Sequence, residues 1–375
     1  MKISFDAKRA YHNNRGLGVY SRNVVRLLNE YYPENQYFLF NPKQKNNIDF
    51  PINENTKEIN PDTFFGKLLP DFWRSKGCVK QIKHLETDIY HGLSQELPVG
   101  IEKTGVKTVV TMHDAIFIRY PELYDTLYRK IFIRKNRYAC RVADRIIAIS
   151  EQTKADFIEF FDVPAEKIDV VYQGCNNIFR EKISEETKSA VRRKYNLPET
   201  FLLNVGAIEK RKNLASIIHA ICRGNLDIPL VAIGNKTAYT DEINTLTAQY
   251  KLEKQVSLLH NVDFADLPAI YAMSEIFIYP SVFEGFGIPI LEALCTGTPV
   301  ITSRGGCFAE TGGKSSIYVD NDNADEMSNA IRRILSDASL RERMKTDGLA
   351  HAENFTDHKI ALNLMNIYRK LLFLP

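Results

Sequence analysis

Two carboxylates, Glu284 and Glu292, are separated by seven residues in a stretch that follows an apolar run and is rich in glycine. Gly285 and Gly287 allow the backbone to approach a ligand closely. Pro289 suits the first turn of a helix, where the N–H group that proline lacks is not needed. The free N–H groups at the start of such a helix favour an anion, for example a diphosphate. The stretch therefore predicts a strand-to-helix turn suited to an anionic ligand.

The spacing of the two acids favours a binding role over hydrolysis. Even partly helical spacing places the carboxylates roughly 10 Å apart at about 1.5 Å per residue. Glycoside hydrolases need two carboxyl groups about 5 to 9.5 Å apart that flank one bond. Glu284 and Glu292 would more naturally hold different parts of one elongated ligand, and a nucleotide sugar has that length. The structural alternative is a turn in which the glycines only shape the backbone and the acids are surface caps.

A second turn brings three consecutive cations together, since Lys210, Arg211 and Lys212 follow an apolar run that ends at Gly206. A helical pattern begins after them, so a helix N-terminus points at the same place. This combination suits a diphosphate. For an isolated cluster, a solvated basic turn would be the favoured explanation. Together with the paired acids, it predicts that both turns converge on one activated sugar.

The elements that position these turns alternate along the chain. Short β-branched and aromatic runs are separated by longer helical patterns, which is typical of an α/β fold with parallel sheets covered by helices. A polar stretch after Gly174 and a charged helix over 181–194 separate two such series, so we expect two doubly wound, Rossmann-like domains of similar size with a cleft between their strand ends. The expected strands are 2–6, 37–41, 88–91, 108–113, 145–150, 168–172, 201–206, 230–234, 256–259, 276–280, 299–303 and 317–320.

Composition excludes several classes of protein. A net charge of +3 over 375 residues lacks the dense basic stripe of a nucleic-acid-binding protein. The six cysteines are scattered, with no metal-binding spacing, which fits buried thiols in a reducing compartment. No signal peptide or membrane-spanning run is evident, so we expect a cytoplasmic protein, with peripheral contact at the inner face of the plasma membrane left open. The triplet that begins at Asp320 has two acids, but it reads as a turn after a strand rather than a metal site.

The motifs together resemble the large retaining glycosyltransferase family 4 of the GT-B fold. Glu284 and Glu292 match its EX7E motif within the stretch PSVFEGFGIPILEAL. The segment RGLGVYSRN from Arg15 is similar to the glycine loop after the family's first strand. The segment TMHD, which contains His113 and Asp114, is similar to its acceptor-side histidine segment. The resemblance covers nearly the whole chain and implies an acceptor-binding domain over 1–178, a nucleotide-sugar-binding domain over 179–355, and a last helix over 356–375 that packs back on the first domain.

The resemblance also implies a role for individual residues. Glu284 would bind hydroxyls of the donor sugar, Glu292 would hold the ribose, and Lys212 would neutralise the diphosphate. Many members carry an arginine where this chain has Ala207, so Arg211 must supply the second cation. The implied catalytic residues are His113, Glu284, Lys212 and Arg211; the implied donor-binding residues are Gly16, Gly18, Gly206, Arg211, Lys212, Asn261, Val262, Gly285, Phe286, Gly287, Ile288 and Glu292; and the implied acceptor-side residues are Arg15, His91 and Asp114.

The implied reaction needs no covalent nucleophile and no metal or other cofactor. In the mechanism usually proposed for the family, the acceptor hydroxyl attacks the face that the diphosphate leaves, and a phosphate oxygen takes its proton. Segments similar to bacterial O-antigen mannosyltransferases suggest GDP-mannose as the donor, with UDP-sugars as the other candidates, and a lipid-linked or polysaccharide acceptor. Two alternatives stay open: a hydrolysing nucleotide-sugar epimerase on the same fold, and a non-catalytic nucleotide-sugar-binding protein.

Two segments interleave aromatic or apolar residues with cations. One runs over 64–76 and the other over 129–137. Both patterns are compatible with an anionic membrane surface. The alternative is that the apolar residues pack inward and the cations are only solvated.

Overall fold

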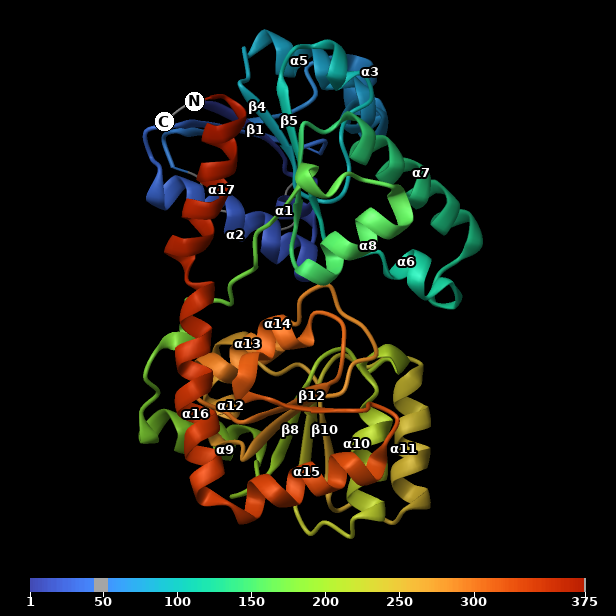
Figure 1. Cartoon of the computed structure of the whole chain (residues 1–375), viewed down its shortest axis with the longest axis vertical. Helices are drawn as coiled ribbons and strands as arrows, with labels where there is room; N and C mark the ends of the chain where they lie inside the picture. The colour runs from blue at the N-terminus through green and yellow to red at the C-terminus, as the bar shows by residue number, and fades with distance from the viewer. Residues whose placement is uncertain (44–52, 374–375) are drawn as a thin grey trace. The chain divides into compact units, whose positions relative to one another are not determined.

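The computed structural model describes residues 1–43 and 53–373. The chain forms two compact units: unit 1 comprises Met1–Gln173 and Asp357–Pro375, and unit 2 comprises Gly174–Thr356. Each unit is a parallel sheet covered by helices (Figure 1). Unit 2 begins five residues before the expected boundary at 178/179. Cys175 accounts for the difference, because it is buried with its Sγ 3.3 Å from the Sγ of Cys295 in unit 2.

Unit 1 contains a seven-stranded sheet in the order β3-β2-β1-β4-β5-β6-β7, with all neighbours parallel. The strands are nearly continuous apolar runs because helices cover both faces of the sheet. All six expected strands are confirmed, whereas β3 was not expected: its sequence TKEI is polar, and β2 is its one neighbour among the described strands. The strands are β1 (Lys2–Asp6), β2 (Gln36–Phe40), β3 (Thr56–Ile59), β4 (Ile89–Gly92), β5 (Lys107–Met112), β6 (Arg145–Ala148) and β7 (Ile168–Val170).

The helices of unit 1 include the last helix of the described chain. Helix α17 packs beside α2, more than 300 residues away in sequence (Figure 1). Asp357 at its start pairs with Arg26 of α2 at 2.7 Å, and Leu364 and Tyr368 are fully buried. Residues 374 and 375 of the expected terminal helix lie outside the described residues. The helices are α1 (Lys8–His12), α2 (Gly16–Tyr31), α3 (Phe64–Leu68), α4 (Pro70–Phe72), a π-helix (Trp73–Gly77), α5 (Val79–His84), α6 (Ile116–Arg119), α7 (Thr126–Val142), α8 (Glu151–Phe161) and α17 (Asp357–Leu371), with 3-10 turns at Ile101–Lys103, Pro121–Leu123 and Ala165–Lys167.

Unit 2 contains a six-stranded parallel sheet in the order β10-β9-β8-β11-β12-β13, and all six expected strands are confirmed. Its core lies between the sheet and helices such as α10 and α15, with Ile217, Ile221, Met327 and Ile331 buried. The strands are β8 (Leu202–Val205), β9 (Leu230–Ile233), β10 (Val256–Leu259), β11 (Ile276–Tyr279), β12 (Val300–Ser303) and β13 (Ile317–Val319). The helices are α9 (Glu185–Tyr195), α10 (Leu214–Arg223), α11 (Tyr239–Gln249), α12 (Leu267–Met273), α13 (Ile288–Cys295), α14 (Phe308–Gly312), α15 (Ala324–Ser336) and α16 (Ala338–Ala352), with 3-10 turns at Asn177–Arg180, Lys210–Lys212, Phe264–Asp266, Gly313–Ser315 and Glu353–Phe355.

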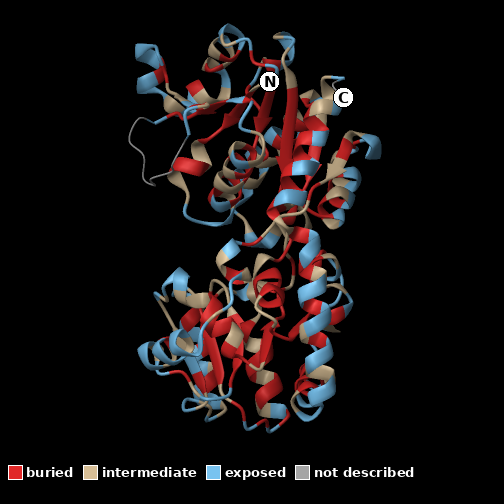
Figure 2. Cartoon of the chain, turned by 90° about the vertical axis from the view of Figure 1, so that its left-hand side faces the viewer, coloured by how far each residue is buried: buried red, intermediate tan, exposed pale blue. Residues whose placement is uncertain are grey.

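Burial follows the layers of each unit. The strands are buried, and the helices turn their exposed residues outward (Figure 2). In both sheets the strand order reverses beside a middle strand, between β1 and β4 in unit 1 and between β8 and β11 in unit 2. Ligands of open α/β sheets bind at the carboxyl ends of strands at such reversals. Within the described ranges, no helix has the length and apolar character needed to cross a membrane.

Candidate functional site

The two turns with paired acids and consecutive cations follow the two strands at the reversal point of unit 2. Lys212 follows β8 and Glu284 follows β11. Their side chains form an ion pair, with Lys212 Nζ 2.5 Å from Glu284 Oε1 and Arg211 Nη1 2.8 Å from the same oxygen. Each of the three side chains is less than one-fifth exposed. The structure therefore brings the cationic turn and the acidic turn together, as the sequence predicts.

All contacts of the Glu284 carboxylate fall on one oxygen. Besides the two cations, Oε1 accepts hydrogen bonds from Ser281 Oγ at 2.6 Å and Tyr279 Oη at 3.0 Å. Burial alone would raise the pKa of Glu284, but the charges of Lys212 and Arg211 outweigh it and lower the pKa to about 2. Glu284 is thus ionised at neutral pH. Its Oε2 has no partner among the described residues, so one oxygen of the carboxylate can accept hydrogen bonds from a ligand.

The two cations differ in how they are held. Arg211 Nη1 donates to the carbonyl of Phe283 at 2.6 Å, and Nη2 donates to Glu209 at 2.8 Å. The backbone carbonyl of Arg211 also accepts from the Val282 N–H at 2.8 Å, so Arg211 joins the two turns. Among the described residues, Lys212 Nζ contacts Glu284 and Tyr279 alone. Lys210 lies apart from the cluster, since it is 69% exposed and faces Glu242 at 3.4 Å.

Glu292 has a different environment on the same segment. It lies in α13, which starts after Gly287 at φ 98°, a conformation that favours glycine. Glu292 is buried, and its Oε2 accepts one hydrogen bond from Tyr271 Oη at 3.0 Å. Burial raises its pKa to about 7, although the Tyr271 bond acts in the opposite direction. The environment therefore lowers the pKa of Glu284 and raises the pKa of Glu292.

The other residues implied on the donor side differ in their surroundings. The Phe286 side chain is buried with its ring 5.6 Å from that of Phe355, so only its backbone can serve a ligand. Gly206 lies beside Lys212, because a Cβ there would be 3.8 Å from its Cδ. Asn261 and Val262 follow β10, the edge strand two positions away from β8. No contact in the described part of the chain links them to Glu284 or Lys212.

His113 follows β5 in unit 1 and is almost fully buried. Its Nε2 lies 2.8 Å from the carbonyl oxygen of Leu93 and its ring packs edge-on against Tyr20. Because a carbonyl only accepts, Nε2 carries the hydrogen and Nδ1 is left as an acceptor. Burial lowers the pKa of His113 to about 4, so the ring is neutral at physiological pH. Asp114 Oδ1 accepts from the N–H of Ile116, the first residue of α6, at 3.2 Å.

Family models match both units. A model described as Glycosyltransferase Family 4 matches residues 15–177, and one described as Glycosyl transferases group 1 matches residues 186–350. The O-antigen chain mannosyltransferase B of Escherichia coli is 30% identical over 99% of this chain and 100% of its own length. The chain belongs to glycosyltransferase family 4. The protein is therefore an enzyme of the glycosyltransferase class.

Solved structures identify the fold of this glycosyltransferase. Sucrose-phosphate synthase from Thermosynechococcus elongatus matches with a TM-score of 0.78 and 19% identity, covering 100% of this chain and 99% of its own. The Anabaena protein HepE in complex with UDP and glucose matches with a TM-score of 0.75 and 19% identity, covering 99% and 100%. These likenesses show that the glycosyltransferase has the GT-B fold, as the sequence predicts.

Two sequence interpretations are wrong for unit 1 of the glycosyltransferase. His91 does not face an acceptor, because it is fully buried with Nδ1 2.6 Å from Tyr368 Oη and Nε2 2.8 Å from Thr111 Oγ1. Burial lowers its pKa to about 3, so it stays neutral. The glycines after Arg15 form no loop.

The segment after Arg15 is instead the first turn of α2. Gly16 is the first residue of this helix, and Arg15 is exposed at its N-cap. Gly18 is buried, and a Cβ on it would lie 1.7 Å from the backbone oxygen of Asn13. Glycine at this position is therefore required by the packing of the chain against itself.

Sequence reasoning missed the tyrosines of the glycosyltransferase site. Tyr279 bridges Lys212 and Glu284, and Tyr271 is the only described donor to the Glu292 carboxylate. Tyr279 is the last residue of β11, and its hydroxyl lies at the carboxyl end of a central strand, where ligands bind. The sequence position of Tyr279 could therefore have indicated a site residue. Tyr271 lies in α12, and its sequence context contains no such signal.

Proposed function

We propose that this enzyme is a retaining mannosyltransferase that transfers mannose from GDP-mannose to a hydroxyl of a saccharide acceptor, lipid-linked or polymeric. The proposal rests on the charged cluster of Lys212 and Glu284 at the reversal point of unit 2. The identity of mannose is supported by the full-length similarity to an O-antigen chain mannosyltransferase. HepE was solved with UDP and glucose, so UDP-sugars are the natural competitors in a donor screen.

Lys212 is the cation proposed to meet the donor diphosphate. In the described ranges its flexible side chain is hydrogen-bonded to Glu284 and Tyr279 alone, so it can turn to a phosphate oxygen without breaking the turn. Arg211 has its guanidinium engaged by protein oxygens on both terminal nitrogens. We assign it the role of holding the two turns together and keeping Glu284 ionised.

The two acids are proposed to bind different ends of the donor. Glu284 stays ionised, and its Oε2 accepts hydrogen bonds from hydroxyls of the transferred sugar. Glu292 accepts hydrogen bonds from the ribose hydroxyls. Because burial raises the pKa of Glu292 to about 7, the donor would favour its ionised form and bind more tightly as the pH rises through 7.

The chemical step proposed here uses the protein mainly as a charged framework. The acceptor oxygen forms a bond to the anomeric carbon on the face from which the diphosphate leaves, and a phosphate oxygen takes the acceptor proton. Lys212 and the N–H groups at the start of α13 stabilise the departing charge, each contributing roughly 3 kcal/mol. His113 is neutral, and its Nδ1 is the acceptor that unit 1 offers to a saccharide hydroxyl. No metal is invoked in this scheme.

The direct test is titration calorimetry with a panel of GDP- and UDP-sugars, followed by product analysis. GDP-mannose should bind most tightly and be hydrolysed slowly without an acceptor. Transfer to a mannose-terminated saccharide should give an α-linkage by NMR, since the donor is α-linked. A β-linked product would refute retention, and epimerised sugar without transfer would indicate an epimerase. Binding of a donor without any turnover would indicate a non-catalytic protein.

A further inference from the structure

Unit 1 exposes a series of large apolar side chains on one short segment. Phe64 and Phe65 of α3 are 76% and 72% exposed, Leu68 is 63% exposed, and Leu69 and Phe72 are more than half exposed. The sequence left open whether these residues pack inward, and the structure shows that they do not. A cluster of this kind marks an interaction surface on a folded protein.

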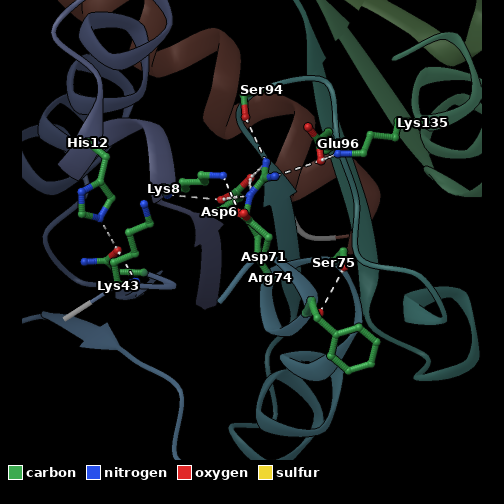
Figure 3. A network of polar contacts seen from close by, with 12 residues as sticks. Asp6, Lys8, His12, Lys43, Asp71, Arg74, Ser75, Ser94, Glu96 and Lys135 are labelled. Atoms are coloured by element: carbon green, nitrogen blue, oxygen red, sulfur yellow. Dashed lines mark hydrogen bonds and ion pairs between the residues drawn. The ribbon is translucent and has the colours of Figure 1, made fainter. Parts of the chain in front are cut away.

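Internal contacts hold this segment in place. Trp73 is buried with its ring stacked 5.9 Å from that of Phe40, and its Nε1 donates to Gln81. Arg74 lies between Asp6 and Glu96, with contacts at 2.5 Å and 2.9 Å (Figure 3). These inward anchors fix the segment to the carboxyl end of β1. The preceding aromatic side chains point outward as a result.

Helix α7 presents a second apolar group among cations. Leu127, Tyr128 and Ile131 are each at least half exposed. The helix carries Arg129, Lys130, Arg134, Lys135, Arg137 and Arg141 and no acidic residue between Thr126 and Val142. Apolar side chains within a basic helix surface are suited to the boundary between lipid headgroups and acyl chains.

One loop joins the two exposed groups. Glu96 contacts both Arg74 and Lys135 of α7, the second at 3.0 Å (Figure 3). Val99 is half exposed, and its N–H donates to the carbonyl of Ser75 at 2.7 Å. The Gly100 N–H donates to Tyr138 Oη of α7 at 2.8 Å. We name the combined surface the apolar-basic face; its apolar residues are Phe64, Phe65, Leu68, Leu69, Phe72, Val99, Leu127, Tyr128 and Ile131.

We propose that the apolar-basic face docks on the surface of an anionic lipid bilayer. Charge complementarity selects this partner. Besides the cations of α7, Lys67 and Lys76 are exposed, while Asp71 pairs with Lys8 at 2.7 Å. A second copy of the chain would oppose the same cations across a two-fold axis, which disfavours a dimer through this face. Anionic headgroups attract them, and the aromatic side chains enter the interface.

The same loop places the face next to the proposed acceptor side of the enzyme, a step that rests on the proposed function. The carbonyl oxygen of Leu93 accepts a hydrogen bond from Nε2 of His113, and Gln95 donates to the backbone oxygen of Asp114 at 2.8 Å. Glu96 and Val99 then reach the apolar-basic face. A lipid-linked acceptor held in the bilayer would thus be presented at the edge of the sheet where His113 lies.

The test is co-sedimentation of the full-length protein with phosphatidylglycerol vesicles and with phosphatidylcholine vesicles. The wild type should bind the anionic vesicles, with salt weakening the binding. The double variant F64E/F65E should lower the partition coefficient by about tenfold or more. The matched control is Phe264→Glu in unit 2, which is also half exposed and should bind like the wild type. Lys130→Gln should weaken binding by about fivefold, in line with about 1 kcal/mol per basic residue.

Several outcomes would overturn the proposal. They are no binding of the wild type, equal binding to both vesicles, or unchanged binding of F64E/F65E. A concentration-dependent dimer that F64E/F65E abolishes would assign the face to a second copy instead. Hydrolysis of a soluble donor should be the same in F64E/F65E and wild type, which also shows that the variant folds. This readout separates a failure of the membrane proposal from a failure of the proposed function.

Discussion

The replacement of Glu292 by glutamine should stabilise the protein and weaken donor binding at the same time. Glu292 is buried with one described hydrogen bond, from Tyr271, and burial raises its pKa to about 7 from an ordinary 4.5. In the unfolded chain the carboxyl ionises near the ordinary value. The contribution of the neutral Glu292 carboxyl to the free energy of unfolding is therefore complete below about pH 4.5. It is lost as the pH rises to about 7 and stays lost above that.

The size of the effect follows from this window. One pKa unit corresponds to about 1.4 kcal/mol, so ionisation of Glu292 between pH 5.5 and 8 costs the native state about 2 kcal/mol. Glutamine keeps the shape and can accept the Tyr271 hydrogen bond without a charge. The gain in unfolding free energy of Glu292→Gln over wild type should thus be about 2 kcal/mol larger at pH 8 than at pH 5.5. Nucleotide affinity should fall by about tenfold or more, because a charged acceptor for the ribose is lost.

Urea unfolding at the two pH values measures the first quantity, and calorimetry with GDP measures the second. The exposed Glu242 in the same unit provides a matched control, and Glu242→Gln should change the unfolding free energy by less than about 0.5 kcal/mol at either pH. The reasoning would be refuted if Glu292→Gln gave the same difference at both pH values. Unchanged GDP affinity would separately refute the ribose role.

Other predictions concern the charged cluster and the terminal helix. Lys212→Ala should lower kcat by about 100- to 1000-fold because the diphosphate loses its cation, while Lys210→Ala should remain near wild type; equal losses in steady-state assays would contradict the assignment. Glu284→Gln should reduce discrimination between donor sugars more than GDP affinity, as measured by competition assays and calorimetry, and the reverse pattern would mean that the roles of the two acids are exchanged. Tyr368→Phe should destabilise the protein by about 1 to 3 kcal/mol in urea unfolding because the buried His91 loses a partner, with GDP affinity unchanged. A stable variant with impaired donor binding would contradict this structural role.

The sequence predicts well the features that depend on local chemistry. Strands buried on both faces are apolar runs that end in turn residues, so β8 and β11 were placed within one residue of their observed ends. The convergence of Lys212 and Glu284 followed because each turn comes after a strand, and parallel strands end at the same edge of a sheet. The sequence could not predict that Lys212 and Arg211 both contact Oε1 of Glu284, since this depends on the rotamers of the individual side chains.

The errors have a common physical cause, which is that partners distant in sequence decide the role of a side chain. His91 ends a strand as a ligand-binding residue would, but Tyr368 of the last helix and Thr111 occupy its two nitrogens. Gly18 has the setting of a ligand loop, yet the backbone oxygen of Asn13 fills the space beside it. Strand β3 lies at the edge of the sheet formed by the described strands and has no apolar run. Its polar sequence therefore gave no signal.

The chain leaves unit 1 after residue 173 and returns to it at residue 357. During synthesis, unit 2 is therefore available as one continuous stretch while unit 1 still lacks α17. The surface of α2 that packs against α17 is covered, and Tyr368 is available to His91, only when the ribosome has passed residue 371. The nascent protein must carry unit 1 with an uncovered apolar face through the translation of 183 residues, so chaperone dependence and aggregation on the ribosome should concentrate in this unit.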